Sequence, residues 1–276
     1  MNDLQQLRYM AEDLSPTERM PLLFLGHGSP MNAIEENIFV EGFRNVAPTL
    51  PRPKSIICIS AHWYTRGTHV TAMPHPETIH DFGGFPKALY QVQYPASGNP
   101  ALAVETQTLL EPATVGLDQQ WGLDHGAWSV LRHFYPEADV PVIELSIDYT
   151  RPADYHFELA GRLASLRDKG VLIVGSGNLI HNLSRVNFSR INEVGYGYDW
   201  AIEARETMNH YLLEGNYRPL TDYLKLSDAV RLAVPTPDHF LPLIYILGMQ
   251  QKGEPLSLFN DQLVAGSLSM TCVKIG

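Results

Sequence analysis

Histidine is the residue type whose placement in this sequence most clearly predicts chemistry. The 276-residue chain has 11 histidines, and His27, His62 and His181 each come just after a short apolar run typical of a buried strand. Ligands of open parallel sheets bind outside the carboxyl ends of the strands, so these imidazoles are expected to share one crevice. His239, in the expected first turn of a helix, can reach the same region. Several imidazoles without cysteine favour Zn, Fe or Cu over Mg or Ca.

Further polar residues lie in the loops that follow the predicted strands. His125, in WGLDHGAW, is expected in a polar loop before a helix, where it could serve as acid, base or hydrogen-bond partner of a substrate. His80, in TIHDFGGFP, has a similar setting. Carboxylates are candidates only by their proximity to these loops, and Asp124 is typical of a residue that caps a turn. They are Asp81, Asp124 and Glu144. The remaining histidines are interpreted as structural: His69, His75, His133, His156 and His210.

Other catalytic motifs find little support. Ser29 and Ser176 lie next to glycines, but neither completes the G-x-S-x-G pattern of a hydrolase nucleophile. No G-x-G-x-x-G or G-x-x-x-x-G-K-[ST] motif follows a predicted strand, which argues against a tightly held dinucleotide or nucleoside triphosphate. Cys58 and Cys272 lie in apolar runs and are interpreted as reduced core thiols rather than a disulfide or a metal site.

The elements that must position these histidines follow an α/β pattern, in which apolar runs alternate with helix-patterned segments. Near-continuous apolar runs predict strands that are covered on both faces. These strands are expected over 21–26, 55–60, 141–146 and 171–176, with a fifth over 69–73 and another in SLSMTCVKI near the C-terminus. Helices are expected over 100–110, 152–168 and 198–213, and a fourth with Thr236 as N-cap and Pro237 at its first position.

These patterns predict a single α/β domain with a mostly parallel central sheet flanked by helices and a metal site at the C-terminal strand ends. We expect a polar N-terminal lead over residues 1–20 and a catalytic domain over residues 21–276. The formal net charge of −10 and the absence of a basic patch argue against nucleic acids and anionic membranes as partners. The first twenty residues lack the apolar core of a secretory signal and no run is long enough to span a membrane, so a cytoplasmic location is expected.

Six segments, in order along the chain, carry a resemblance to a known family. They are LFLGHGSPMN around His27, SAHWYTRG around His62, TIHDFGGFP around His80, WGLDHGAW around His125, SGNLIHNL around His181 and TPDHFLPLIYILG around His239. With these segments the chain resembles the class III extradiol dioxygenases, the superfamily of the protocatechuate 4,5-dioxygenase catalytic subunit. Within it the chain is most similar to the bacterial 4,5-DOPA extradiol dioxygenase branch.

The resemblance implies a function and a role for each histidine. It implies one divalent metal that binds a DOPA-like catechol and O₂, with ring opening to a muconic semialdehyde. His27, His62 and His239 match the family's metal ligands, His181 a catalytic histidine, and His125 a residue that hydrogen-bonds substrate or oxygen. Small-molecule catechol and O₂ are the expected partners, and a monomer or small homo-oligomer the expected state. Four aromatic residues of the same loops either form an apolar wall for the catechol ring or are ordinary packing residues: Trp63, Phe82, Phe85 and Tyr90.

The ligand set departs from the wider superfamily, which commonly uses two histidines and a glutamate. With His239 in place of the acid, the site also suits tetrahedral Zn(II), with His181 or water as fourth ligand. We therefore expect Zn(II) in the isolated protein and Fe(II) for dioxygenase turnover, so that His181 is either a ligand or a base. Two rival functions use the same residues: a zinc hydrolase of a peptide, amide or ester, and a non-catalytic protein that binds a metal or an aromatic ligand.

Overall fold

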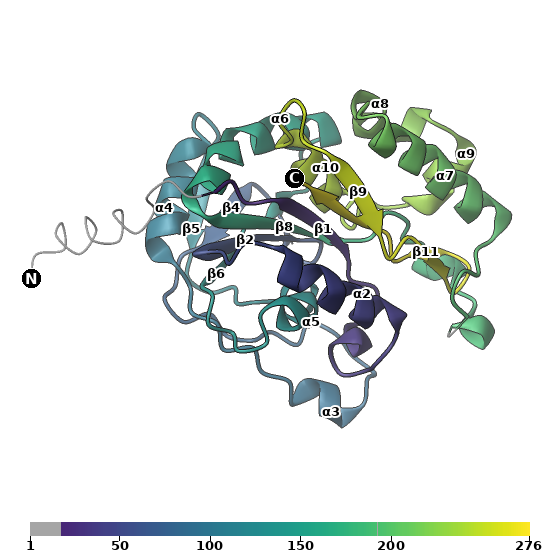
Figure 1. Cartoon of the computed structure of the whole chain (residues 1–276), viewed down its shortest axis with the longest axis horizontal. Helices are drawn as coiled ribbons and strands as arrows, with labels where there is room; N and C mark the ends of the chain where they lie inside the picture. Colours follow the sequence, from purple (N-terminus) through teal and green to yellow (C-terminus); the bar gives the residue numbers. More distant parts are fainter. Residues whose placement is uncertain (1–17, 192) are drawn as a thin grey trace, which may run out of the picture.

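The computed structural model of the chain describes residues 18–191 and 193–276. Its central sheet has six strands in the order β6-β2-β8-β1-β12-β9 (Figure 1). In chain order they are β1 (Leu22–Gly26), β2 (Ser55–Ser60), β6 (Val142–Glu144), β8 (Val171–Gly177), β9 (Leu256–Phe259) and β12 (Cys272–Ile275).

Four neighbouring strands of this sheet are parallel. β2 pairs with β6 and β8, and β8 pairs with β1, all in parallel. β12 and β9 then extend the sheet in antiparallel register beyond β1. The mostly parallel sheet is therefore confirmed. The carboxyl ends of β1, β2 and β8 meet at one edge of the sheet. The last paired residues there are Gly26 with Gly177 and Ser60 with Ser176.

Successive side chains of each strand point to opposite faces of the sheet, which divides the core into two layers. Leu22 and Phe24 face one hydrophobic cluster, whereas Leu23 and Leu25 face the other. The first cluster is covered by α6 (Ala153–Ala160), α7 (Asp199–Leu213) and α10 (Leu241–Gly248), and the second by α2 (Ile38–Val46) and α5 (His125–Phe134) (Figure 1). Burial on both faces explains why the strands are near-continuous apolar runs. The single α/β domain with flanking helices is thus confirmed.

Short elements surround these layers. Three two-stranded sheets join β3 (Tyr64–Thr65) to β7 (Ile147–Asp148), β4 (Thr68–Thr71) to β5 (Val115–Asp118), and β10 (Leu263–Val264) to β11 (Leu268–Ser269). The remaining α-helices are α3 (Lys87–Tyr90), α4 (Pro100–Leu109), α8 (Arg218–Thr221) and α9 (Asp228–Ala233). β5 and β9 were not predicted from the sequence, because their alternating and partly exposed residues lack a continuous apolar run.

Two strand predictions need correction. The strand expected over 141–146 leaves the central sheet after Glu144, because Ser146 N–H then donates to the carbonyl of His69 and Ile147 joins β3. The strand expected over 69–73 is shorter, at Thr68–Thr71, and pairs with β5 rather than with the central sheet.

Two helix predictions were also too simple. The helix expected over 152–168 is regular only to Ala160 and continues as a 3₁₀-helix over Gly161–Lys169. The helix expected to begin at Thr236 begins at Leu241, so His239 lies in the turn before it and Thr236 is not its N-cap. The carbonyl of Pro237 accepts from the N–H groups of both Phe240 and Leu241. The residues expected to form the first turn of the helix therefore form a separate turn that precedes it.

The described ends of the chain bear on two further predictions. Residues 1–17 of the expected polar lead lie outside the described residues. Arg19 already pairs with Asp168, and Met20 is buried in the second cluster. Cys58 and Cys272 are buried and unpaired, as expected. Within 18–191 and 193–276, no helix combines the length and the apolar composition that crossing a bilayer requires.

Candidate metal centre

Five histidines meet where the parallel strands end. His27 follows β1 directly, His62 lies two residues after β2 and His181 four residues after β8. His239 reaches the same place from the turn before α10. His125 is the first residue of α5, not part of a loop as expected, because the Asp124 side chain caps this helix by accepting from Ala127 N–H.

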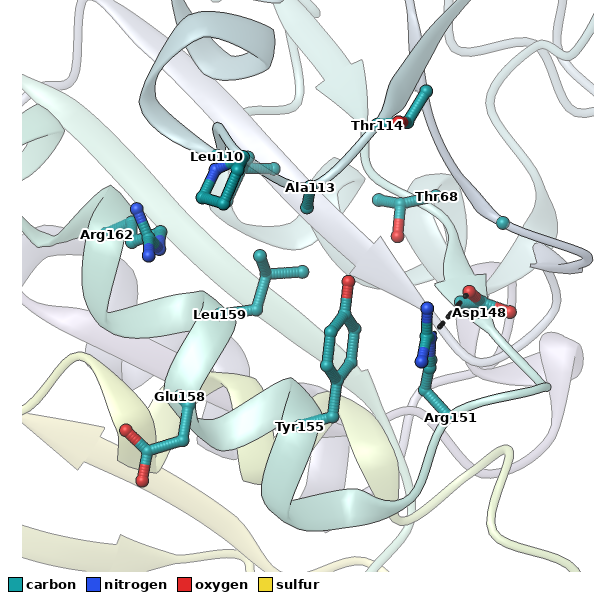
Figure 2. Close-up of a pocket in the computed structure, with 12 residues that line it drawn as sticks. Thr68, Leu110, Ala113, Thr114, Asp148, Arg151, Tyr155, Glu158, Leu159 and Arg162 are labelled. Atoms are coloured by element: carbon teal, nitrogen blue, oxygen red, sulfur yellow. Dashed lines mark ion pairs between the residues drawn. The ribbon is translucent and has the colours of Figure 1, made fainter.

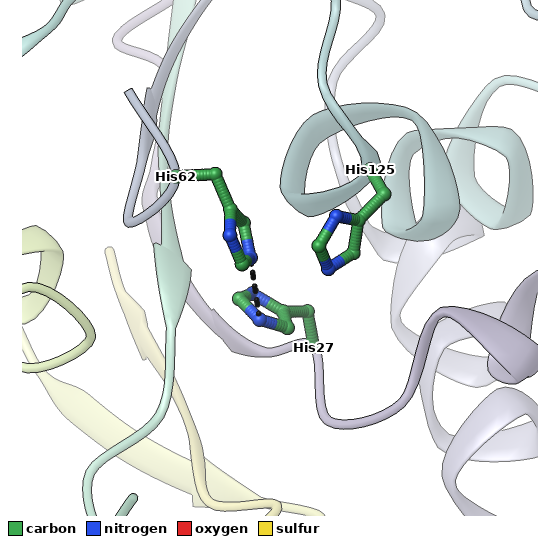
Figure 3. Close-up of side chains that lie close together, drawn as sticks. All are labelled: His27, His62 and His125. Atoms are coloured by element: carbon green, nitrogen blue, oxygen red, sulfur yellow. Dashed lines mark hydrogen bonds between the residues drawn. The ribbon is translucent and has the colours of Figure 1, made fainter. Parts of the chain in front are cut away.

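His27 and His62 face each other through their Nε2 atoms, which lie 3.2 Å apart (Figure 3). The Ser176 hydroxyl donates to the carbonyl of Gly126 at 2.5 Å, so it can only accept at its contact of 3.0 Å with His27 Nδ1. His27 therefore carries its hydrogen on Nδ1, and its Nε2 lone pair points at His62. Two nitrogens bound to one tetrahedral ion at about 2.05 Å lie about 3.3 Å apart, so the observed separation fits a shared metal.

His239 completes a regular triangle with this pair. The ring centroids of His27, His62 and His239 are separated by 5.0, 5.2 and 5.0 Å. Imidazoles bound through Nε2 to one tetrahedral ion place their centroids roughly 5 Å apart, since each centroid lies about 3.2 Å from the ion. The spacing of these three rings therefore fits a three-histidine metal centre.

His125 approaches the same pair from α5. Its ring centroid is 3.9 Å from that of His62 and 5.7 Å from that of His27, and the three side chains converge in Figure 3. Each of them offers a nitrogen within 4.8 Å of the others. The Asp81 carboxylate accepts from both the backbone N–H and Nδ1 of His125 at 2.9 Å. This hydrogen bond leaves Nε2 as the nitrogen that His125 presents to the site.

His181 stacks on His239. Their rings lie 3.5 Å apart at 11°, and Nδ1 of His239 is hydrogen-bonded to the Asp238 carboxylate. A separation of 3.5 Å is well below the spacing of roughly 5 Å that two ligands of one tetrahedral ion require. His181, Asp238 and His239 form a second group whose ligand atoms lie within 4.8 Å of one another.

The position of His239 depends on a close approach to β8. Asn178 N–H donates to the carbonyl of His239 at 2.9 Å. A Cβ at Gly177 would lie 2.1 Å from the same carbonyl oxygen, so only glycine lets the turn come this near to the strand end. Gly177 therefore helps to fix the third corner of the triangle.

Burial keeps three imidazoles of the site neutral, those of His27, His62 and His181. Burial, followed by the influence of His62, lowers the pKa of His27 well below its usual range. Burial, followed by the influence of His125, lowers the pKa of His62 to about 2. Burial, followed by the influence of His239, lowers the pKa of His181 to about 3. Neutral imidazoles are the form that binds metals, so these side chains need not release protons at neutral pH.

Two carboxylates that contact the histidines, Asp81 and Asp238, remain ionised. Burial opposes ionisation of Asp81, but the two hydrogen bonds that it accepts from His125 outweigh burial and lower its pKa. At Asp238, the hydrogen bond with His239 likewise overcomes burial and lowers the pKa. Each carboxylate thus holds an Nδ1–H of a neighbouring imidazole, as is common beside metal-binding histidines.

Two buried carboxyl groups lie behind His125. Asp124 accepts from the Ser60 hydroxyl at 2.6 Å, and its own N–H donates to Glu144 at 2.9 Å. Burial, followed by the charge of Asp124, raises the pKa of Glu144 well above its usual range. Glu144 is thus a buried carboxyl group that holds Asp124 and Trp121 in place by accepting from both.

Aromatic side chains flank one side of the cluster. Phe82 lies edge-on to His125 with ring centroids 5.5 Å apart, and it also contacts Phe85 and Tyr90. Trp63 differs, because it is buried and stacks on Trp121 at 3°. His80 packs against Phe82, Tyr90 and Trp128 and hydrogen-bonds the carbonyl of Val92 at 2.9 Å.

The sequence predicted that these histidines lie close together, but several groups that orient them were missed. Ser176 was considered only as a nucleophile, and Asp238 only as a helix-start residue. Asp81 was a candidate by proximity alone, since its contact with His125 spans 44 residues of sequence. A carboxylate next to a loop histidine, as in His80-Asp81, is the one signal that points to it.

A separate cavity of about 580 Å³ opens beside α6. Arg151, Tyr155 and Thr68 line it, and Arg151 lies 3.9 Å from Asp148 (Figure 2). Its lining includes none of the five clustered histidines.

The comparison with known proteins agrees with this geometry. A family model for the catalytic LigB subunit of aromatic ring-opening dioxygenases matches residues 21–264. The chain belongs to this family. The matched segment of the LigB family includes all five clustered histidines, and the resemblance to extradiol dioxygenases is thereby confirmed.

Relatives within the LigB family include bacterial and plant proteins. The chain is 48% identical to the 4,5-DOPA dioxygenase extradiol of Escherichia coli (strain K12), over 94% of this chain and 95% of that protein. It is 36% identical to the 4,5-DOPA dioxygenase extradiol of Beta vulgaris, over 89% and 92%. A crystal structure of an uncharacterized protein from Escherichia coli K12 superimposes with a TM-score of 0.81 at 44% identity, covering 94% of this chain and all of that one.

Proposed function

We propose that this chain is an extradiol dioxygenase that opens the ring of a DOPA-like catechol at a divalent metal. The triangle formed by His27, His62 and His239 carries the proposal, because its spacing of 5.0 to 5.2 Å fits three imidazoles on one ion. Relatives named for the 4,5-DOPA reaction, which match almost the whole chain, support the substrate class. We assign the catalytic domain to residues 21–276.

The proposed ligands are His27, His62 and His239. Their Nδ1 atoms contact Ser176, Asp81 and Asp238 respectively, which leaves each Nε2 free for a metal. When bound, a redox-active divalent ion brings the catechol and O₂ together and passes electron density between them. We propose Fe(II) for turnover, since Zn(II) has no redox chemistry, and Zn(II) as an ion that the purified protein can also hold.

His181 is the proposed base. Burial and the neighbouring His239 lower its pKa to about 3, so the ring is neutral at neutral pH and offers a lone pair to a catechol hydroxyl. Its stacking on His239 places it next to a proposed ligand, and its 3.5 Å ring separation disfavours simultaneous binding of both rings to one tetrahedral ion. We therefore favour the base over the ligand role of the two that the sequence left open.

His125 is proposed to hydrogen-bond the catechol or dioxygen. The Asp81 contact fixes its ring, and Phe82 lies against its edge, so substrate orientation depends on the Asp81–Phe82 loop. Phe82, with Phe85 and Tyr90, supplies an apolar wall that a catechol ring can pack against. In the overall reaction one ring carbon–carbon bond breaks, both oxygen atoms of O₂ enter the product, and no hydrogen is lost.

The cellular setting is part of the proposal. Two buried cysteines without a disulfide, Cys58 and Cys272, support a reducing compartment such as the cytoplasm. We propose a monomer or small homo-oligomer whose partners are the catechol and O₂.

The test is reconstitution of the metal-free protein under anaerobic conditions with Fe(II) or with Zn(II). DOPA is then added, followed by air, while O₂ uptake and the absorbance of a ring-opened product are recorded. We expect equimolar O₂ uptake and product with Fe(II) and none with Zn(II). Failure of O₂ uptake across a panel of catechols, together with anaerobic hydrolysis of an ester or amide by the Zn(II) form, would instead establish the rival hydrolase.

A further inference from the structure

The carboxylate of Asp81 faces two imidazoles of the site, those of His125 and His62. Its Oδ1 is 2.9 Å from Nδ1 of His125, and its Oδ2 is 3.7 Å from Nδ1 of His62. Both rings therefore turn Nδ1 towards the same carboxylate and Nε2 away from it. Nε2 of His62 lies 3.2 Å from Nε2 of His27 (Figure 3). The side of His62 that faces away from Asp81 is therefore the side of the proposed metal.

The Asp81 carboxylate is itself held in place. The backbone N–H of His125 donates to Oδ1 at 2.9 Å, and this N–H lies in the first turn of α5, where it has no partner within the helix. The side chain of Asp81 is only 16% exposed. An ionised carboxylate offers acceptors alone, so Nδ1 of His125, which bonds to it at 2.9 Å, must carry the hydrogen. Nδ1 of His62 lies 3.7 Å from Oδ2, beyond hydrogen-bond distance, but the negative charge at this position still favours an Nδ1–H over a lone pair.

We propose that Asp81 is a positioning residue that holds His125 and His62 in their Nδ1–H tautomers, so that both present Nε2 to the site. The inference rests on the proposed function for the roles of His62 as ligand and His125 as substrate contact. Asp238 and Ser176 each orient a single proposed ligand. Asp81 differs because one carboxylate couples a metal ligand to the residue that orients the substrate.

Two substitutions separate the two contacts of Asp81. In Asp81→Asn the amide oxygen can replace Oδ1 and still accept both bonds from His125. Its NH₂ group then replaces Oδ2, so that an N–H donor faces the Nδ1–H donor of His62. Asp81→Ala removes both contacts. Asp139→Asn is the matched control, because Asp139 is an exposed carboxylate paired with Arg52.

The measurements use the protein loaded with Zn(II), which is diamagnetic, without catechol or O₂. Long-range ¹H–¹⁵N correlation spectra report which imidazole nitrogen carries the hydrogen, with His125 assigned through His125→Asn. Competition with a chromogenic chelator gives the affinity for Zn(II). We expect Asp81→Asn to keep the Nδ1–H tautomer of His125 while losing about tenfold in Zn(II) affinity. Asp81→Ala should lose both the uniform Nδ1–H tautomer of His125 and the Zn(II) affinity, whereas Asp139→Asn should keep both.

The inference is overturned if Asp81→Asn binds Zn(II) within twofold of the unsubstituted protein, a result that decides the question even if Asp81→Ala does not fold. A folded Asp81→Ala variant whose His125 stays uniformly in the Nδ1–H tautomer also overturns it. Neither readout requires turnover. A chain that binds Zn(II) as expected but never opens a catechol would therefore refute the proposed function and leave the role of Asp81 standing.

Discussion

Ser176 fixes the tautomer of His27. Its hydroxyl donates to the carbonyl of Gly126 and therefore accepts from Nδ1 of His27 at 3.0 Å. The buried contact reaches across the sheet ladder from β8 to the residue that follows β1. A side chain that resembles a nucleophile in the sequence thus acts through its acceptor lone pair.

Ser176→Ala is expected to weaken metal binding. Without the hydroxyl, His27 can place its hydrogen on Nε2, the atom that faces His62, and a protonated nitrogen does not bind a metal. We expect a loss of about tenfold in Zn(II) affinity, as for other groups that orient metal-binding histidines. Chelator competition measures it. Thr108→Ala, which removes an exposed hydroxyl on α4, is the control; equal affinities for all three proteins would contradict the role of Ser176.

His239→Ala and His181→Ala should fail in different ways. Removing a proposed ligand should abolish stoichiometric metal binding, whereas removing a proposed base should leave the metal and lower kcat by about a hundredfold or more. Metal content after dialysis, compared with O₂ uptake by the Fe(II) form, separates the two effects. If His181→Ala also loses the metal, His181 is a ligand and the base must be sought elsewhere.

Gly177→Ala should disturb the site through the backbone. The added Cβ would lie 2.1 Å from the carbonyl of His239, so the turn before α10 must move away from β8. We expect a loss of about 1–3 kcal/mol in the free energy of unfolding, together with weaker metal binding. Urea unfolding of the metal-free protein measures the free energy of unfolding, and chelator competition measures the metal affinity. Gly83→Ala, whose Cβ would meet no atom within 4 Å, should leave stability unchanged.

Stability should fall in mild acid because of His156. This buried imidazole contacts the Tyr245 hydroxyl and the carbonyl of Asp148, and burial lowers its pKa to about 4. The unfolded state binds a proton near pH 6.5, before the folded state does, so stability decreases as pH falls from 6.5 to 4. The contribution is at most about 3 kcal/mol.

Urea unfolding of the metal-free protein at several pH values measures this dependence. His27, His62 and His181 titrate with the same sign, so the readout for His156 is the difference between the unsubstituted protein and His156→Gln. The variant should lose less stability between pH 6.5 and 4. Parallel curves for the two proteins would show that His156 does not contribute.

The strands that carry the site were predictable because they are covered on both faces. β1, β2 and β8 are continuous apolar runs, and their ends fix where His27, His62 and His181 must lie. His239 was placed near the correct region although its helix begins later than expected. The ring triangle itself could not be predicted, since it depends on how closely the turn before α10 approaches Gly177.

The groups that orient the histidines were harder to predict because their contacts are tertiary. At the start of α5, Asp124 caps the helix and Asp81, 44 residues earlier, accepts the backbone N–H of His125. Its neighbour Gly126 weakens any local helical signal. β5 and β9 escaped prediction for a related reason, since partly exposed strands at the periphery lack a distinctive pattern.

The strand order has a consequence for how the protein is made. β1 and β2 are consecutive in the chain, yet β8 lies between them in the sheet. A growing chain on the ribosome cannot complete this ladder until residue 177 has emerged, and His239 follows later still. Metal capture by all three proposed ligands must therefore wait until nearly the whole chain has been synthesised, so a nascent or truncated chain that ends before His239 has no complete centre to load.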